Sequence, residues 1–198
     1  MAAPWQFSGN KRERGSTLIE VLVSLLLLSF TLLGIAGLMS ATTRYQLGVD
    51  SRSSVSLLFN DLGNRIRSNG DVSATYVYSA TWAAQQAAIG TAPSTCGATD
   101  TTACTPAQRA AYDVWEMRTA IRASMPQGSL LVAGNPNEGM TMSFLWFDKD
   151  FLEDASTLRQ SPTCAASMTA LQLQSCCPTA ASVSSTRGVR CLNFSFIR

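Results

Sequence analysis

Glu20 is the residue in this chain whose type and position most clearly indicate chemistry. It is the only charged residue between Gly15 and Thr43, a stretch that reads GSTLIEVLVSLLLLSFTLLGIAGLMSATT. A carboxylate at the edge of a membrane helix costs a few kcal/mol unless it finds a partner, so it is expected to be functional. The alternative is a carboxylate that is protonated or that reaches the membrane surface along its own helix.

The six cysteines are the second group that could do chemistry, and all of them follow residue 95. An even number of cysteines in an oxidising compartment predicts disulfides. Because no C-x-x-C spacing occurs, a cysteine zinc site is disfavoured. A Cys96–Cys104 bond would close a short loop and is the favoured first pair. Cys176 and Cys177 are adjacent, and adjacent cysteines rarely bond to each other. Their expected partners are therefore Cys164 and Cys191, in an order that the spacing does not fix.

The composition excludes several classes of function. The chain has no histidine, which removes the commonest general base and the commonest nitrogen ligand for metals, so we expect no enzyme, no metal and no cofactor. Without residues 1–15 it has twelve basic and twelve acidic residues, and no nucleic-acid partner is expected. Asp148-Lys149-Asp150 resembles a fragment of a calcium loop, but it lacks the glycine and the terminal glutamate, which favours a solvated loop.

The apolar stretch around Glu20 has the length of a membrane span. No charge occurs from Val21 to Thr43, and about twenty helical residues cross a hydrocarbon core of roughly 30 Å. Three basic residues, Lys11, Arg12 and Arg14, precede it and predict that this end stays in the cytoplasm. The sequence therefore predicts a single membrane crossing, with everything after Arg44 outside the cytoplasm.

The helix is expected to continue beyond the membrane as an amphipathic segment. Apolar residues recur at helical spacing, and Asn69-Gly70 is a stop signal. Asp61 and Arg65 lie off this stripe as an i, i+4 pair. We therefore expect one helix with a transmembrane part, 16–43, and an amphipathic part, 44–68. The stripe consists of Val55, Leu58, Phe59, Leu62 and Ile66.

Residues 69–198 are expected to form a head domain with the disulfides. Thr75–Tyr78 could be a short strand. Thr105 as N-cap, Pro106 and Gln108 predict the start of a second helix, which ends at Pro126. Its predicted buried face is Ala107, Ala110, Val114, Met117, Ile121 and Met125. Alternating residues predict strands over 130–132, 140–147 and 189–197, the first two joined by a turn at 135–139. An antiparallel sheet on the amphipathic helix gives an α+β fold.

The N-terminal motif carries a resemblance to a known family. Gly15-Ser16-Thr17-Leu18-Ile19-Glu20-Val21, with basic residues before it and an apolar helix after it, resembles the processing site of type IV prepilins. The resemblance implies that a prepilin peptidase cuts after Gly15, removes residues 1–15 and methylates Ser16, where most members have phenylalanine. In a filament, the new ammonium would lie near a neighbour's Glu20, because each buried charge alone is costly.

A second block narrows the resemblance to the PilV group of minor pilins. Its residues are Cys104, Asp113, Pro126-x-Gly128 and Trp146-x-Asp148. The resemblance implies a type IV pilin-like fold and a role in the complex that primes pilus assembly or lies at the pilus tip. It also implies as partners other minor and major pilins, the prepilin peptidase, the inner-membrane assembly platform and a PilY-type adhesin. The expected location is the inner membrane, followed by the periplasm and the extracellular pilus.

Two other functions remain open from the sequence. A type II secretion pseudopilin has the same N-terminal device. Alternatively, small residues near Ala36 could end a secretory signal peptide and leave a soluble, disulfide-braced periplasmic binding protein that begins at Gly37. The length of the apolar run and the position of Glu20 inside it disfavour this second alternative.

Overall fold

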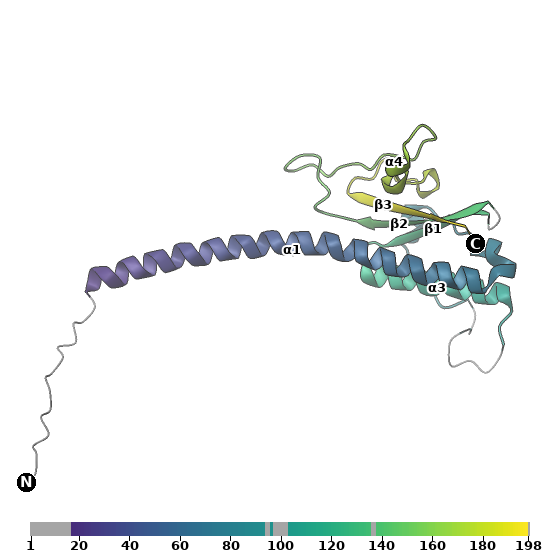
Figure 1. The fold of residues 1–198 in the computed structure, drawn as a ribbon, viewed down its shortest axis with the longest axis horizontal. Helices are drawn as coiled ribbons and strands as arrows, with labels where there is room; N and C mark the ends of the chain where they lie inside the picture. Colours follow the sequence, from purple (N-terminus) through teal and green to yellow (C-terminus); the bar gives the residue numbers. More distant parts are fainter. Residues whose placement is uncertain (1–16, 94–95, 97–102, 136–137, 198) are drawn as a thin grey trace, which may run out of the picture. The chain divides into compact units, whose positions relative to one another are not determined.

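The computed structural model describes residues 17–93, 96, 103–135 and 138–197. The chain divides into two compact units, residues 1–45 and 46–198, and helix α1 (Leu18–Ser68) runs through the boundary between them (Figure 1). The expected cleavage site at Gly15 and Ser16 lies outside the described residues, as do the topology residues Lys11, Arg12 and Arg14.

The first unit contains the apolar part of α1, whose side chains are exposed. Among the described residues, α1 is the one helix long and apolar enough to cross a membrane. No residue in its most apolar stretch is buried by the rest of the protein. The hydroxyls of Ser24, Ser29 and Thr31 donate to carbonyl oxygens of their own helix at 2.7–2.8 Å. These polar side chains are therefore satisfied without water, as a lipid environment requires.

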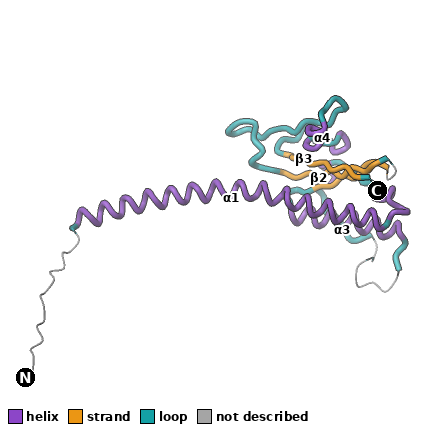
Figure 2. The backbone as a smooth tube through the Cα atoms, viewed as in Figure 1, coloured by secondary structure: helices purple, strands orange, loops and turns teal. Residues whose placement is uncertain are grey.

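The second unit is built on an antiparallel sheet of three strands in the order β1-β2-β3 (Figure 2). The strands are β1 (Ser129–Asn135), β2 (Gly139–Phe147) and β3 (Val189–Phe196). Val132 pairs with Met142, which pairs with Phe194 on its other side. The expected long helix and antiparallel sheet are thus confirmed, and the fold is pilin-like α+β.

One face of the sheet forms the main core with α1 and helix α3 (Pro106–Ser124). Met142 and Phe144 of β2 are fully buried there, together with Val55, Leu62 and Ile66 of α1. The half-buried ring of Phe59 stacks on Phe194, with ring centroids 4.7 Å apart. Ala107 was predicted to be buried but is exposed, because the α3 residues in this core begin one turn later, at Ala110.

The opposite face of the sheet forms a second core that the sequence did not indicate. Leu131, Leu145 and Val189 pack there against Trp82 of the short helix α2 (Trp82–Gln85). Helix α4 (Ala170–Ser175) and the 3-10 helix η2 (Thr179–Ala181) also belong to this side, and α4 lies over β3 (Figure 1). The sheet is therefore covered on both faces.

The predicted strand over Thr75–Tyr78 is wrong. Residues Gly70–Tyr76 form the 3-10 helix η1, and only Tyr78 pairs with the sheet, through a single bridge to Val132. The 3-10 turn places the ring of Tyr76 in the main core, where it is fully buried and its hydroxyl bonds to Asp113.

The three disulfides settle the order that the spacing left open. Cys96 is bonded to Cys104, and the adjacent cysteines go to different partners, with Cys164–Cys176 and Cys177–Cys191. The last bond ties the segment after α4 to β3 inside the second core.

Replacing Gly134 with alanine is expected to lower the free energy of unfolding by about 1–3 kcal/mol. Gly134 has φ of +107°, and an added Cβ would lie 2.3 Å from the carbonyl oxygen of Gly139 across the β1–β2 hairpin. Urea unfolding of the full chain in detergent micelles measures the change. Gly90→Ala is the control, because Gly90 also has a positive φ, +78°, but no described residue lies within 4 Å of its added Cβ. An equal effect of both variants would show that the clash contributes nothing.

Candidate functional site

Glu20 lies in the first turn of α1, which begins at Leu18. Its backbone N–H donates to the carbonyl oxygen of Thr17 at 3.0 Å. A carboxylate in this position interacts favourably with the positive end of the helix dipole. The structure thus places Glu20 at the start of the apolar helix, next to the segment that contains the expected cleavage site.

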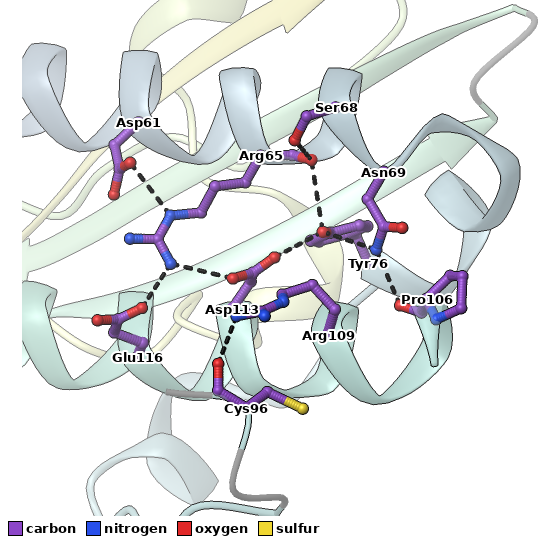
Figure 3. Close-up of polar contacts among 10 residues, drawn as sticks. All are labelled: Asp61, Arg65, Ser68, Asn69, Tyr76, Cys96, Pro106, Arg109, Asp113 and Glu116. Carbon is purple, nitrogen blue, oxygen red and sulfur yellow. Dashed lines mark hydrogen bonds and ion pairs between the residues drawn. The ribbon is translucent and has the colours of Figure 1, made fainter. Parts of the chain in front are cut away.

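A polar cluster in the second unit surrounds Arg65, near the end of α1 (Figure 3). Its guanidinium donates from Nε to Asp61 at 3.1 Å and from one terminal nitrogen to Asp113 at 3.0 Å and to Glu116. The Asp61 pair is the predicted one within α1. The other two carboxylates come from α3, so a single guanidinium joins the two helices.

Tyr76 and Asn69 extend this cluster to the start of α3. The hydroxyl of Tyr76 donates to the second carboxylate oxygen of Asp113 at 2.7 Å. The side-chain amide of Asn69 donates to the Tyr76 oxygen at 3.2 Å and to the carbonyl oxygen of Pro106 at 2.8 Å. Asp113 is the centre of the network, because both of its oxygens are bonded and only 5% of its side chain is exposed.

Burial and hydrogen bonding shift two pKa values in the cluster. Burial alone lowers the pKa of Arg65, but the hydrogen bonds with Asp61, Glu116 and Asp113 outweigh it and raise that pKa. Burial raises the pKa of the Tyr76 hydroxyl, and its hydrogen bond to Asp113 raises it further. Arg65 thus stays charged and Tyr76 stays a neutral donor over the range in which proteins are stable.

The Arg65 cluster has the chemistry of a clamp and not of a catalytic site. Its groups bond to one another, and none of them is a nucleophile beside a free general base. Among the described residues, no three His, Cys, Asp or Glu side chains are placed so that together they could hold a metal ion. What the cluster does is to hold α1, η1 and α3 together over the main core.

Replacing Tyr76 with phenylalanine is expected to remove a tyrosine ionisation with a midpoint well above pH 10. Above about pH 10 the unfolded chain releases this proton while the folded chain retains it, so folding stability falls as pH rises. The difference in absorbance at 295 nm between the wild type and Tyr76→Phe, titrated with alkali, gives the curve of Tyr76 alone. A midpoint near 10 would contradict the buried hydrogen bond. Tyr112→Phe, at a half-buried position outside the cluster, is the control.

The segment that resembles a calcium loop is held by other contacts. Asp148 pairs with Arg190 at 2.6 Å, and only 15% of its side chain is exposed, so this residue is not solvated as expected. Asp154 is fully solvated, and the backbone N–H groups of Ser156 and Thr157, which donate to its carboxylate, lower its pKa. Asp148 also accepts from the backbone N–H of Asp150 at 2.8 Å, so both carboxylates hold turns within the loop.

Sequence reasoning missed the role of Asp113 in the clamp. A signal for it was present, because a carboxylate lies among Ala110, Val114 and Met117 on the buried face of α3, where a charge must be paired. Which residue pairs with it could not be found, since Arg65 lies 48 residues away in the sequence.

The comparisons with known proteins concern the N-terminal segment. Residues 10–36 match the family described as the prokaryotic N-terminal methylation motif. The comparisons with curated proteins and with solved structures gave no match. Proteins of the pilin family are structural and not enzymes. The chain therefore carries, on a pilin-like α+β fold, the N-terminal methylation motif that is typical of type IV pilins and pseudopilins.

Proposed function

We propose that this chain is a minor pilin that takes part in type IV pilus assembly. The observation that carries the proposal is the motif match over residues 10–36, which covers Gly15, Ser16 and Glu20 together with most of the apolar part of the helix. A secretory signal peptide would not require a glutamate five residues after a glycine. The motif therefore favours prepilin processing over cleavage near Ala36.

The proposed mechanism assigns a role to each segment of the chain. A prepilin peptidase removes residues 1–15 and methylates Ser16. The helix over 16–43 is held first by lipid and then by neighbouring helices, which would cover its exposed leucines. Nothing lies within 4 Å of a Cβ added at Gly34 or Gly37, so a neighbouring helix can approach closely there. Residues 44–68 carry the head domain, 69–198.

Glu20 sets the register of neighbouring subunits in this mechanism. Its carboxylate pairs with the N-terminal ammonium of an adjacent subunit once residues 1–15 are gone. The pair matters because either charge alone, buried among apolar helices, is strongly unfavourable. Helices that slip along one another lose the pair, so the correct stagger is favoured.

The proposed partners follow from the resemblance to the PilV group. They are other minor and major pilins, the inner-membrane assembly platform and a PilY-type adhesin that the priming complex presents. The chain would remain in the inner membrane before assembly and reach the periplasm and the cell exterior in the pilus.

The test of the processing step is the intact mass and N-terminal sequence of the chain purified from its native cells. A start at Ser16, free or N-methylated, is the expected result. A start at Gly37 would remove Glu20 and the membrane helix together and would overturn the filament mechanism. An unprocessed Met1 in assembled filaments would overturn it as well.

A deletion strain separates a pilin from a secretion pseudopilin, since the motif is common to both. We expect the loss of surface pili with normal type II secretion. The reverse pattern, a secretion defect with normal pili, would assign the chain to the pseudopilins.

A further inference from the structure

The sheet of the second unit has two edges, one along β1 and one along β3, and the chain treats them differently. The β1 edge is closed. Val132 exchanges both backbone hydrogen bonds with Tyr78 at 2.8 Å. The backbone of Leu130 is bonded by a side chain instead of another backbone. The side-chain amide of Gln85 accepts from the Leu130 N–H at 3.0 Å and donates to the Leu130 carbonyl oxygen at 2.9 Å. A buried glutamine thus takes the place of a strand.

The β3 edge is closed only at its beginning. The N–H of Asp148 donates to the carbonyl oxygen of Gly188 at 2.8 Å. In an antiparallel pair this means that the backbone N–H and C=O groups of even-numbered residues in β3 point toward β2, and those of odd-numbered residues point away from it. The first outward carbonyl oxygen, that of Val189, accepts from the hydroxyl of Ser161 at 2.6 Å. Further along, the outward backbone groups of Asn193 and Ser195 have no partner among the described residues. We call these groups the open edge.

A groove with a volume of about 750 Å³ borders the open edge. Ala170 and Leu173 of α4 line one side, and residues 192–195 of β3 line the other; Thr141 and Ser143 of β2 line it too, so the groove extends over the sheet face as well as along the edge. None of the residues that line the groove is charged, and no charge or proline occurs from Leu192 to Phe196. Natural sheet edges are usually protected from pairing by lysine, proline or an inward charge, and this one is not.

We propose that the open edge accepts an extended, uncharged strand from a different polypeptide chain, which becomes the fourth strand of the sheet. The main-chain groups of Asn193 and Ser195 would supply the hydrogen bonds. Apolar side chains of the incoming strand would cover the half-buried Leu192 and Phe194 on one face and Leu173 on the other. The proposal does not depend on processing at Gly15.

The position of α4 beside β3 favours a different chain over a second copy of this one. In a β3–β3 pair, the second copy would bring its own α4 to the same edge, because α4 is in contact with β3. Two copies of α4, each with its Cys164–Cys176 loop, would then meet at one edge, whereas a single extended strand brings no helix there.

Amide hydrogen exchange on the full chain in detergent micelles, followed by NMR, tests the open edge directly. In the free chain the amides of Asn193 and Ser195 should exchange at least about tenfold faster than those of Leu192 and Phe194. The probe is an acetylated and amidated heptapeptide of alternating threonine and valine. It should slow both outward amides, and the same peptide with every amide N-methylated should not.

Ser195→Pro removes an outward N–H without removing a bond to β2, so it should abolish the protection of Asn193 by the peptide. Slow exchange at Leu192 and Phe194 shows that the Ser195→Pro variant is folded. Ser195→Lys, which keeps the backbone N–H, is the second test variant. Ser195→Thr is the control. Outward amides that are already protected in the free chain would overturn the proposal. So would peptide protection that survives Ser195→Pro, or self-association of the chain that Ser195→Pro abolishes, which would assign the edge to a second copy.

Discussion

Replacing Arg65 with methionine is expected to lower the free energy of unfolding by about 3 kcal/mol or more. Methionine keeps most of the apolar stem but leaves the carboxylate of Asp113 without its cation, in a site where 5% of that side chain is exposed. A buried charge that has lost its partner costs far more than an exposed ion pair contributes. Urea unfolding of the full chain in detergent micelles, followed by tryptophan fluorescence, measures the loss.

Two further variants show whether Asp113 causes the loss. Arg52→Met removes an exposed arginine from the same helix and should change the free energy by less than about 0.5 kcal/mol. Arg65→Met combined with Asp113→Asn should recover part of the loss, because the neutral amide needs no cation and can still accept from Tyr76. If the double variant is less stable than Arg65→Met, the buried-charge explanation fails.

The other two carboxylates of the cluster should matter much less. The side chains of Asp61 and Glu116 are 48% and 44% exposed, and water replaces the guanidinium easily when it is lost. Asp61→Asn and Glu116→Gln are each expected to cost at most about 1 kcal/mol in the same assay. The clamp between α1 and α3 thus depends on its one buried carboxylate.

The parts of the fold that could be predicted from the sequence are those governed by local periodicity. The stripe through Val55, Leu62 and Ile66 repeats at the period of a helix, and alternation along β2 repeats at the period of a strand. The capping box of Thr105 and Gln108 marked the start of α3 to the residue, since each side chain bonds the backbone of the other.

The parts that could not be predicted depend on contacts between distant segments. The sequence around Tyr78 is typical of a strand, yet Tyr78 forms only a single bridge, to Val132. The residues before it form a 3-10 helix that buries Tyr76. Gln85 has no local signal as an edge cap, since its partner Leu130 lies 45 residues further on. The second core escaped prediction for the same reason, because Trp82 meets Val189 only once the sheet has formed.

The functional features also differ in whether a short sequence segment or contacts between distant segments form them. The N-terminal motif was readable because Gly15 and Glu20 lie in one short segment of the sequence, and the family match over residues 10–36 covers both. The Arg65 clamp and the open edge at Ser195 exist only in three dimensions. The motif belongs to the N-terminal segment of the chain, whereas the clamp and the open edge belong to the second unit.

Replacing Glu20 with glutamine is expected to reduce incorporation of the chain into filaments by about tenfold or more, with leader removal unchanged. Gln has the size of Glu but no charge, so a neighbour's N-terminal ammonium would be buried without a counter-ion. The penalty for such a charge is about 3–5 kcal/mol, which is more than a tenfold change in an equilibrium constant. The ratio of the chain in sheared filaments to the chain in membranes, measured by immunoblot, gives the result.

Ser24→Ala is the matched control for this prediction. Ser24 lies one turn after Glu20 and its hydroxyl bonds to the carbonyl oxygen of Glu20 at 2.7 Å, so its polar group is satisfied within its own helix. Its removal should leave assembly unchanged. If Glu20→Gln also assembles normally, Glu20 is only a carboxylate at the membrane surface and the charge-pair mechanism is wrong. If Glu20→Gln remains uncut, the residue acts at the peptidase, and the register of the filament must be set by other contacts.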